Sequence, residues 1–269
     1  MKKLFFMGFA LLLCAMWPAD AAAQLKIGGR KLNTGKLLEA GKDVAKAVTL
    51  SDKDIAQLSR EAVEWMDANN PIADETTEYG ARLKRLTEGI TEINGLPLNF
   101  KVYHVVDVNA FACGDGSIRV FSALMDLMDD DELMAIIGHE IGHVVHADVK
   151  HAMKNAYLSS AARNAAGAAE GSTLAKLSDS QLGEVVTAFT GAQFSQKQEY
   201  EADEYGFEFS VKNGFSTYGM GNSLNKLVEL SKGAKSSTVQ KMFSSHPDSE
   251  KRAARMKEKA DAYVAAHQQ

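Results

Sequence analysis

Two histidines bracket a glutamate in the stretch HEIGH, and these three side chains could do metal chemistry. On a helix, residues four apart lie on one face about 6 Å apart along the axis, so His139 and His143 can bind a single ion. Glu140 lies beside that ion without being forced to bind it. It is therefore free to take a proton from a water molecule that a zinc ion makes acidic. Such a site needs a third ligand.

The downstream stretch QEYEAD offers carboxylates for that role. Glu199 and Asp203 are four apart on a predicted helix, so Glu199 can complete a site of two histidines and one glutamate while Asp203 accepts a hydrogen bond from a ligand imidazole. Taken alone, the same stretch is typical of an acidic, solvated helix face. The presence of HEIGH favours the metal site, with one Zn²⁺ per chain.

Capping residues and periodicity predict the elements that position these groups. A helix begins at the capping residue Ser51 and ends before Pro71, and a second helix follows. The alternating stretches LNFKVYHVVDVNAFA and SIRVFS predict a pair of strands, after which helix returns and the aspartates at 129–131 cap the segment with HEIGH. The second helix mentioned above is expected over 74–90. After HEIGH we expect a glycine-broken connection over 161–172, a helix from about 180 to Gly214, and a helix over 217–232.

From VNAFA through HEIGHVVHAD and QEYEAD to SSHPDSEKR, the chain resembles the zinc metallopeptidases that include the CAAX prenyl protease and the bacterial heat-shock membrane protease. It is especially similar to their small periplasmic and outer-membrane lipoprotein members. The resemblance implies that Glu199, rather than Glu201 or Glu204, is the third zinc ligand and that Asp203 supports a ligand. Asp148 matches a position at which the family carries Asp or His.

The fold that accommodates these elements is α+β and zincin-like, mainly helical with a small sheet. In zincin-like enzymes the edge strand of the sheet lies over the metal helix, where an extended peptide can pair with it. We expect Asn109, Ala110, Phe111 and Ala112 to form that substrate-binding edge. The predicted organisation is a metallopeptidase domain over 24–269, with N-terminal helices over 24–90 and a catalytic core over 98–269.

The stretch SSHPDSEKR carries two further candidates. Proline stiffens the turn that presents His246, and the resemblance places a like segment near the zinc. His246 is then catalytic, either as a partner of the developing oxyanion or as a latch on the fourth zinc position, and Arg252 lies on the substrate-binding loop and supports it. The alternative is that His246 caps the final helix and Arg252 is a surface charge.

Other titratable residues have more ordinary interpretations. His146 projects on roughly the face of HEIGH one turn further along, and the remaining histidines at 104, 151 and 267 are expected on the surface. Cys113 is expected to be a packed or partly exposed thiol, because no partner base can be argued for it from sequence.

The first 23 residues have the three-part layout of a secretory signal. Lysines precede an apolar run too short to span a bilayer, and ADAAAQ offers small residues for cleavage. We therefore expect export to the periplasm or cell envelope. Lipidation of Cys14, which would give an outer-membrane lipoprotein and membrane association, is the minority interpretation because Leu13 precedes the cysteine.

Composition limits the partners. The chain has 269 residues, 45% of them hydrophobic, and a formal net charge of −5. With no basic block and no glycine-rich phosphate loop, nucleic acid and nucleotides are poor candidates for partners. The leading hypothesis is a secreted zinc endopeptidase acting on unfolded or misfolded envelope proteins. The competing hypothesis is a zinc-stabilised chaperone-like or scaffold protein, and an exopeptidase would need a pocket for a free terminus.

Overall fold

A computed structural model describes residues 26–27, 30–31, 50–165, 177–233, 245–247 and 249–267. The expected signal segment and Cys14 lie outside these residues. No helix within the described ranges is long and apolar enough to cross a membrane. The helices are α2 (Asp52–Asn69), α3 (Glu78–Leu86), α4 (Ser122–Leu127), α5 (Asp130–Val145), α6 (Asp148–Ala165), α7 (Asp179–Thr190), α8 (Gln196–Lys212), α9 (Gly219–Gly233) and α11 (Ser249–His267).

The sheet that supports the site has four strands in the order β3-β6-β8-β7. Its strands are β3 (Ile72–Ala73), β6 (Asn99–Tyr103), β7 (Ala110–Ala112) and β8 (Ser117–Phe121), and the short pairs β1 (Lys26–Ile27) with β2 (Arg30–Lys31) and β4 (Glu92–Ile93) with β5 (Leu96–Pro97) lie outside it. β6 pairs in parallel with β8, whereas β7 pairs antiparallel with β8 on its other side. Within the described residues β7 has no second neighbour, so it is an edge strand as predicted.

The prediction of two strands in this region was wrong, because the first alternating stretch forms two. The backbone leaves the sheet after Tyr103, and the Val105 N–H and C=O are held by the hydroxyl of Ser122. The chain then crosses to the far side of β8 and re-enters as β7. Alternation of side chains is the same in one long strand and in two strands that flank a third, so it could not reveal the crossover.

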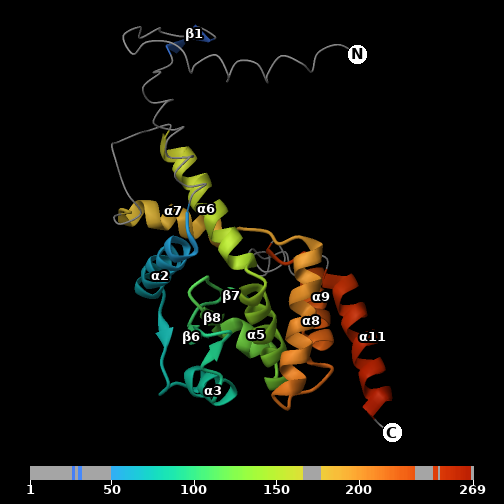
Figure 1. Cartoon of the computed structure of the whole chain (residues 1–269). Coiled ribbons are helices and arrows are strands. Elements are labelled where there is room, and N and C mark those ends of the chain that lie inside the picture. Colours follow the sequence, from blue (N-terminus) through green and yellow to red (C-terminus); the bar gives the residue numbers. More distant parts are fainter. Residues whose placement is uncertain are drawn as a thin grey trace, which may run out of the picture.

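Helix α5 forms the centre of the molecule. Every residue from Glu132 to Val144 is buried, with β7 and β8 against one side and α8 and α9 against the other (Figure 1). Its predicted cap is confirmed: the Asp129 side chain accepts the Glu132 N–H, and the Glu132 carboxylate accepts the Asp129 N–H. The sheet and the outer helices thus bury the HEIGH helix from both sides, in an α+β, zincin-like fold.

Glycines allow α5 and α8 to approach closely. A Cβ added to Gly142 would lie 3.0 Å from the Ala202 Cα, and one added to Gly206 would lie 2.9 Å from the His139 nitrogen. Side chains at these positions would therefore push the two backbones apart. The close crossing sets HEIGH opposite the first turns of α8, where Glu199 and Asp203 lie.

Several helix limits differ from the predictions. The predicted helix over 74–90 is shorter, because Thr77 caps α3 and Thr87 ends it. Residues 161–165 of the predicted connection belong to α6, and 166–172 lie outside the described residues. The predicted helix from 180 to 214 is two helices, because Ser195 is itself an N-cap that starts α8. Gly214, at φ 80°, follows the end of α8 as expected.

Candidate metal centre

Four side chains from three parts of the chain converge at the α5–α8 crossing. His139, His143, Glu199 and His246 each offer a ligand atom, and these atoms lie within 4.8 Å of one another. The Nε2 atoms of His139 and His143 are 3.1 Å apart, and the Nδ1 atom of His246 is 3.0 Å from a Glu199 oxygen. All four residues are buried. Two or three imidazoles and a carboxylate aimed at one point are a donor set that zinc accepts.

The outer nitrogens of both α5 histidines bind carboxylates. Nδ1 of His139 lies 2.9 Å from Asp203, and Nδ1 of His143 lies 2.9 Å from Asp148. Asp148 can reach back because Ala147 has a left-handed conformation, φ 63°, which ends α5 and turns the chain into α6. These bonds orient the rings with their Nε2 atoms toward the common point.

Arg252 holds the two acidic residues of α8 in place. Its guanidinium donates two hydrogen bonds to Asp203, at 2.7 and 2.6 Å, and pairs with Glu199. Only 2% of Arg252 is exposed, and His246 is buried as well. The alternative in which Arg252 is a surface charge is therefore wrong. Its expected contact with substrate stays a prediction, since its observed partners are carboxylates of the site.

The charges of the site suit a cation. Burial would raise the pKa of Glu199 and of Asp203, but His246 and His143 lower the first and Arg252 and His139 lower the second, so both stay ionised. Burial lowers the pKa of His139, whereas bonds to Asp148 and Glu199 outweigh burial and raise the pKa of His143 to about 9. A metal must displace that proton, so binding releases acid.

The predicted substrate edge lies beside this cluster. Asn109, Ala110, Phe111 and Ala112 line a cavity of about 370 Å³ together with Glu140 and His246. The Glu140 Oε1 atom is buried and has no hydrogen-bond partner, and the Nε2 atom of His246 is 3.8 Å away. The Oδ1 atom of Asn109 is likewise buried without a partner. Buried acceptors are rarely left unpaired, so these two mark where water or substrate would bind.

Comparison with known proteins agrees with this geometry. The sequence model of a protein family, described as Peptidase family M48, matches residues 79–260. This span contains every donor of the cluster. The chain belongs to Peptidase family M48.

Relatives in Escherichia coli (strain K12) extend the similarity over nearly the whole chain. Metalloprotease LoiP is 40% identical over 249 residues, which cover 92% of this chain and 97% of LoiP. Metalloprotease YcaL is 38% identical over 229 residues, 85% of this chain and 88% of YcaL. The Beta-barrel assembly-enhancing protease is 30% identical over 175 residues, 61% of this chain but 35% of its own length. The protein is therefore a member of a family of metal-dependent proteases.

Two residues around the candidate metal centre were missed by the sequence analysis. The ring of Phe194 stacks on His143 with 4.0 Å between the ring centroids, and its backbone N–H donates to the Ser245 carbonyl, beside His246. Gln198 donates to the second oxygen of Asp148 at 2.6 Å. Gln198 could have been found, because it stands three residues after Ser195 in a capping box. Nothing in the sequence indicates the ring contact of Phe194.

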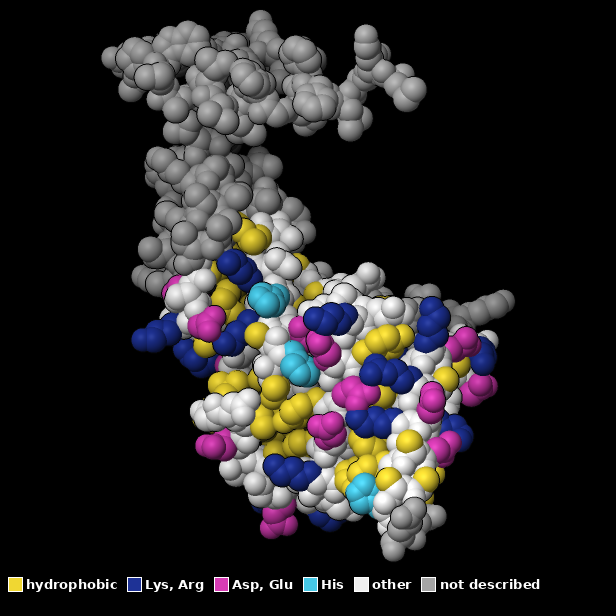
Figure 2. All heavy atoms as spheres, turned by 45° about the vertical axis from the view of Figure 1, so that its right-hand side comes forward, with side chains coloured by type: hydrophobic (Ala, Val, Ile, Leu, Met, Phe, Trp, Pro, Cys, Tyr) yellow, Lys and Arg dark blue, Asp and Glu magenta, His cyan; other side chains and the backbone are white. Residues whose placement is uncertain are grey.

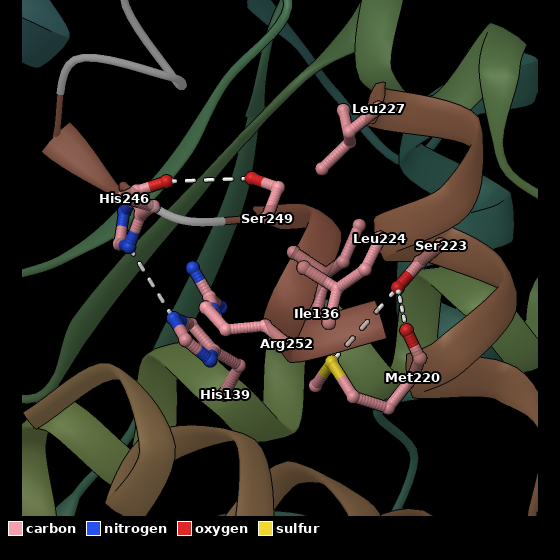
Figure 3. A pocket seen from close by; sticks show the side chains of 9 residues that line it. All are labelled: Ile136, His139, Met220, Ser223, Leu224, Leu227, His246, Ser249 and Arg252. Carbon is pink, nitrogen blue, oxygen red and sulfur yellow. Dashed lines mark hydrogen bonds between the residues drawn. The ribbon is translucent and has the colours of Figure 1, made fainter. Parts of the chain in front are cut away.

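A second cavity lies beside the donor cluster, between α5, α9 and α11 (Figure 3). Its walls are the apolar side chains of Ile136, Met220, Leu224 and Leu227, and His139, His246 and Arg252 close one end. This apolar backing keeps water from that side of His139. The unpaired oxygens of Glu140 and Asn109 lie instead on the side that faces β7.

The other candidates lie away from the centre. His146 ends α5 and is exposed, as are the histidines at 104, 151 and 267, and none of them joins the donor cluster. Cys113 is buried, and burial raises the pKa of its thiol well above the usual range, which fits a packed residue rather than a nucleophile.

Proposed function

We propose that the protein is a zinc-dependent endopeptidase of the HExxH type with a glutamate as third ligand. The observation that carries the proposal is the Glu140 carboxylate, buried at the edge of the donor cluster with one oxygen unpaired. Burial without a partner is costly for a carboxylate unless the site supplies one when it works. A water molecule on the β7 side of the cluster would be that partner.

In this proposal His139, His143 and Glu199 hold the zinc ion. When bound, zinc acts as a Lewis acid that polarises the scissile carbonyl and makes water acidic enough to ionise near neutral pH. Glu140 accepts the proton from the attacking water and returns it to the leaving amine. Asp203 and Asp148 keep the two imidazoles in the tautomer that presents Nε2, and Arg252 keeps Asp203 ionised.

The edge strand supports an endopeptidase. β7 presents one side without a strand partner in the described sheet, so an extended peptide can add to it next to Glu140. Main-chain pairing of this kind needs no free terminus. Asn109 at the start of the strand offers its unpaired side-chain oxygen to a substrate N–H.

The proposed location is the periplasm or cell envelope, and the proposed substrates are unfolded or misfolded proteins there. Support comes from the lysines, apolar run and small residues within positions 1–23. The face shown in Figure 2 carries Lys and Arg intermixed with Asp and Glu, which does not suit a polyanion. The mass of the mature N-terminus tests export, since cleavage without added lipid is expected.

Replacement of Glu140 by Gln tests the mechanism. The variant should keep one zinc per chain, because the ligands are intact, but lose about a thousandfold or more of its activity on unfolded casein, since a general base contributes about 10²–10⁴ and a polarised water is left without a proton acceptor. Glu208→Gln, an exposed position on α8, is the matched control and should retain full activity. Undiminished proteolysis by Glu140→Gln would sink the proposal.

A second candidate is a chaperone-like or scaffold protein in which the metal is structural. The observation that favours it is His246, whose Nδ1 atom joins the cluster and makes four protein donors, as structural zinc sites have. Removal of the metal by a chelator separates the two functions. Loss of casein cleavage with retained far-ultraviolet circular dichroism supports the peptidase, whereas unfolding without any prior cleavage activity supports the structural role.

A further inference from the structure

An open groove lies next to the metal centre, between α6, α7 and the segment that joins α7 to α8. It encloses about 700 Å³, part of it open to solvent. Exposed His151, Asn155 and Ser159, spaced four apart along α6, form one rim. Alanines from both helices, among them Ala152 and Ala188, form its walls. In Figure 1 the two helices cross beyond the sheet, on the side away from α11.

The lining of the groove is neutral and able to form hydrogen bonds. Imidazole, amide and hydroxyl groups both donate and accept, as the main chain of an extended peptide requires. The one carboxylate in the lining, Asp148, is buried and already bonded to His143 and Gln198. Small alanine walls leave room for substrate side chains of different shapes. The groove is therefore suited to a polypeptide backbone, with little selection by charge.

The groove adjoins the cleft under the edge strand. Ala192 and Phe194 line both cavities, so a chain that passes Glu140 would reach the groove over these two residues. β7 has only three residues, Ala110–Ala112, and a peptide added to it can form few main-chain hydrogen bonds. An extended substrate would need additional contacts beyond the strand, and this groove lies where the strand's cleft ends.

We propose that the α6–α7 groove is a remote subsite that binds an uncharged, extended segment of the polypeptide substrate through its main chain. This inference rests on the proposed peptidase function. Recognition at a distance from the scissile bond, without demand for a particular side chain, matches a substrate class of unfolded polypeptides. It predicts that long substrates are used better than short ones.

The test fills the groove with a large side chain and compares two peptides. Asn155→Trp places an indole over the alanine walls, and Thr187→Trp puts the same residue at an exposed position of α7 outside the lining. The substrates are neutral peptides of about 6 and about 15 residues with one shared cleavage site, since a strand advances about 3.3 Å per residue and the longer peptide therefore extends further from that site toward the groove. For Asn155→Trp the ratio of kcat/KM for the long over the short peptide should fall at least about fivefold, because the indole blocks main-chain hydrogen bonds that only the long peptide would form in the groove. Thr187→Trp should leave the ratio unchanged.

Binding is measured separately so that the subsite and the catalytic proposal can fail independently. The Kd of the long peptide, labelled with a fluorophore, is determined by anisotropy on zinc-loaded Glu140→Gln protein with and without Asn155→Trp. Weakening of at least about fivefold supports the subsite even if no peptide is cleaved, since anisotropy reports binding alone. An unchanged Kd, or an equal loss of kcat/KM on both peptides, would overturn it.

Discussion

Two buried arginines in this molecule have similar partners and different consequences. Arg119, in β8, is 1% exposed and binds Asp67 of α2 through two nitrogens at 2.8 and 3.1 Å. Arg252, in α11, is 2% exposed and binds Asp203 of α8 in the same two-pronged manner. Each arginine fastens a helix to another element through a carboxylate that would be costly to bury alone.

The difference lies in what remains unpaired. Around Asp67, Lys101 and the Tyr103 hydroxyl supply further donors at 2.7 Å, and the remaining Arg119 nitrogen donates to the carbonyls of Asn99 and Ile118. Asp203, by contrast, holds the outer nitrogen of His139, whose inner nitrogen faces Glu199. The Glu140 oxygen of the same site has no partner. Burial of charge is thus a poor indicator of function, whereas a buried acceptor left without a donor, such as the Glu140 oxygen, indicates where water or substrate would bind.

Replacement of each arginine tests most directly how the two networks differ. Arg119→Met and Arg252→Met should each lower the free energy of unfolding by about 3–5 kcal/mol in chelator, because each leaves a buried carboxylate without its guanidinium partner. Asp67 keeps 16% of its side chain exposed and still pairs with Lys101, so the loss for Arg119→Met should lie near the lower value. Urea unfolding followed by circular dichroism measures both.

Added zinc should then separate the two variants. A metal cation placed against Glu199 can offset part of the missing guanidinium charge, so excess zinc should restore part of the stability of Arg252→Met. It should restore none for Arg119→Met beyond what zinc adds to the wild type. An equal effect of zinc on both variants would mean that the two networks do not differ as described.

The parts of the site that the sequence predicts are those set by local spacing. The histidines of HEIGH share a helix with a capping box at its start, and Glu199 and Asp203 share another, so each pair's geometry follows from the helical repeat. The edge strand was also predicted. The expected assignment of roles to these residues stays a prediction, although the structure brings them together.

Contacts between distant segments could not be predicted in this way. Asp67 and Arg119 are 52 residues apart, and His246 meets His139 from 107 residues away. Pairings of that kind depend on the strand order and on how α11 packs, which single-residue patterns do not encode. Only the resemblance to a family placed His246 near the metal, and nothing indicated Arg119 or Phe194.

Gly206→Ala tests the network around Asp203 without touching the network around Asp67. The added Cβ would lie 2.8 Å from the Ala135 carbonyl oxygen and 2.9 Å from the His139 nitrogen, so α5 and α8 must separate by some tenths of an ångström. We expect a net loss of about 1–2 kcal/mol, since overpacking costs about 1–3 kcal/mol and alanine favours helix by up to about 1 kcal/mol. Zinc affinity should fall about tenfold because the ligands shift.

The control for this substitution is Gly183→Ala in α7, where the Cβ would meet only the Trp65 ring, at 3.3 Å. Competition with a chromogenic chelator gives the zinc affinity of both variants. Gly183→Ala should leave it unchanged. Equal affinities for Gly206→Ala and wild type would show that the close approach of the two helices is not needed to position the ligands.

His246→Ala tests whether His246 blocks the metal site when no substrate is bound. Because the His246 Nδ1 atom lies among the donors, we expect it to act as a latch, so its removal should raise basal casein cleavage several-fold, roughly 1 kcal/mol, with zinc retained. Initial rates and zinc content measure this. Lost turnover with zinc retained would instead assign His246 to the oxyanion, and unchanged kinetics with unchanged zinc affinity would reject both roles.

The last prediction concerns the pH dependence of the Asp67–Arg119 network. Burial acts to raise the pKa of Asp67, but bonds from Arg119, Lys101 and Tyr103 outweigh it and hold that pKa below its ordinary value. A group with a lowered folded pKa stabilises the protein fully above its unfolded pKa, about 3.9, and loses that contribution as pH falls through the folded value. The stability gap between wild type and Asp67→Asn should therefore be constant from about pH 7 to about pH 5 and narrow below about pH 4, by at most about 1.4 kcal/mol per pH unit. Urea unfolding in chelator measures the gap without interference from metal release. A gap that stays constant down to about pH 3 would contradict a lowered pKa at Asp67, since protonation there must remove the pair's contribution.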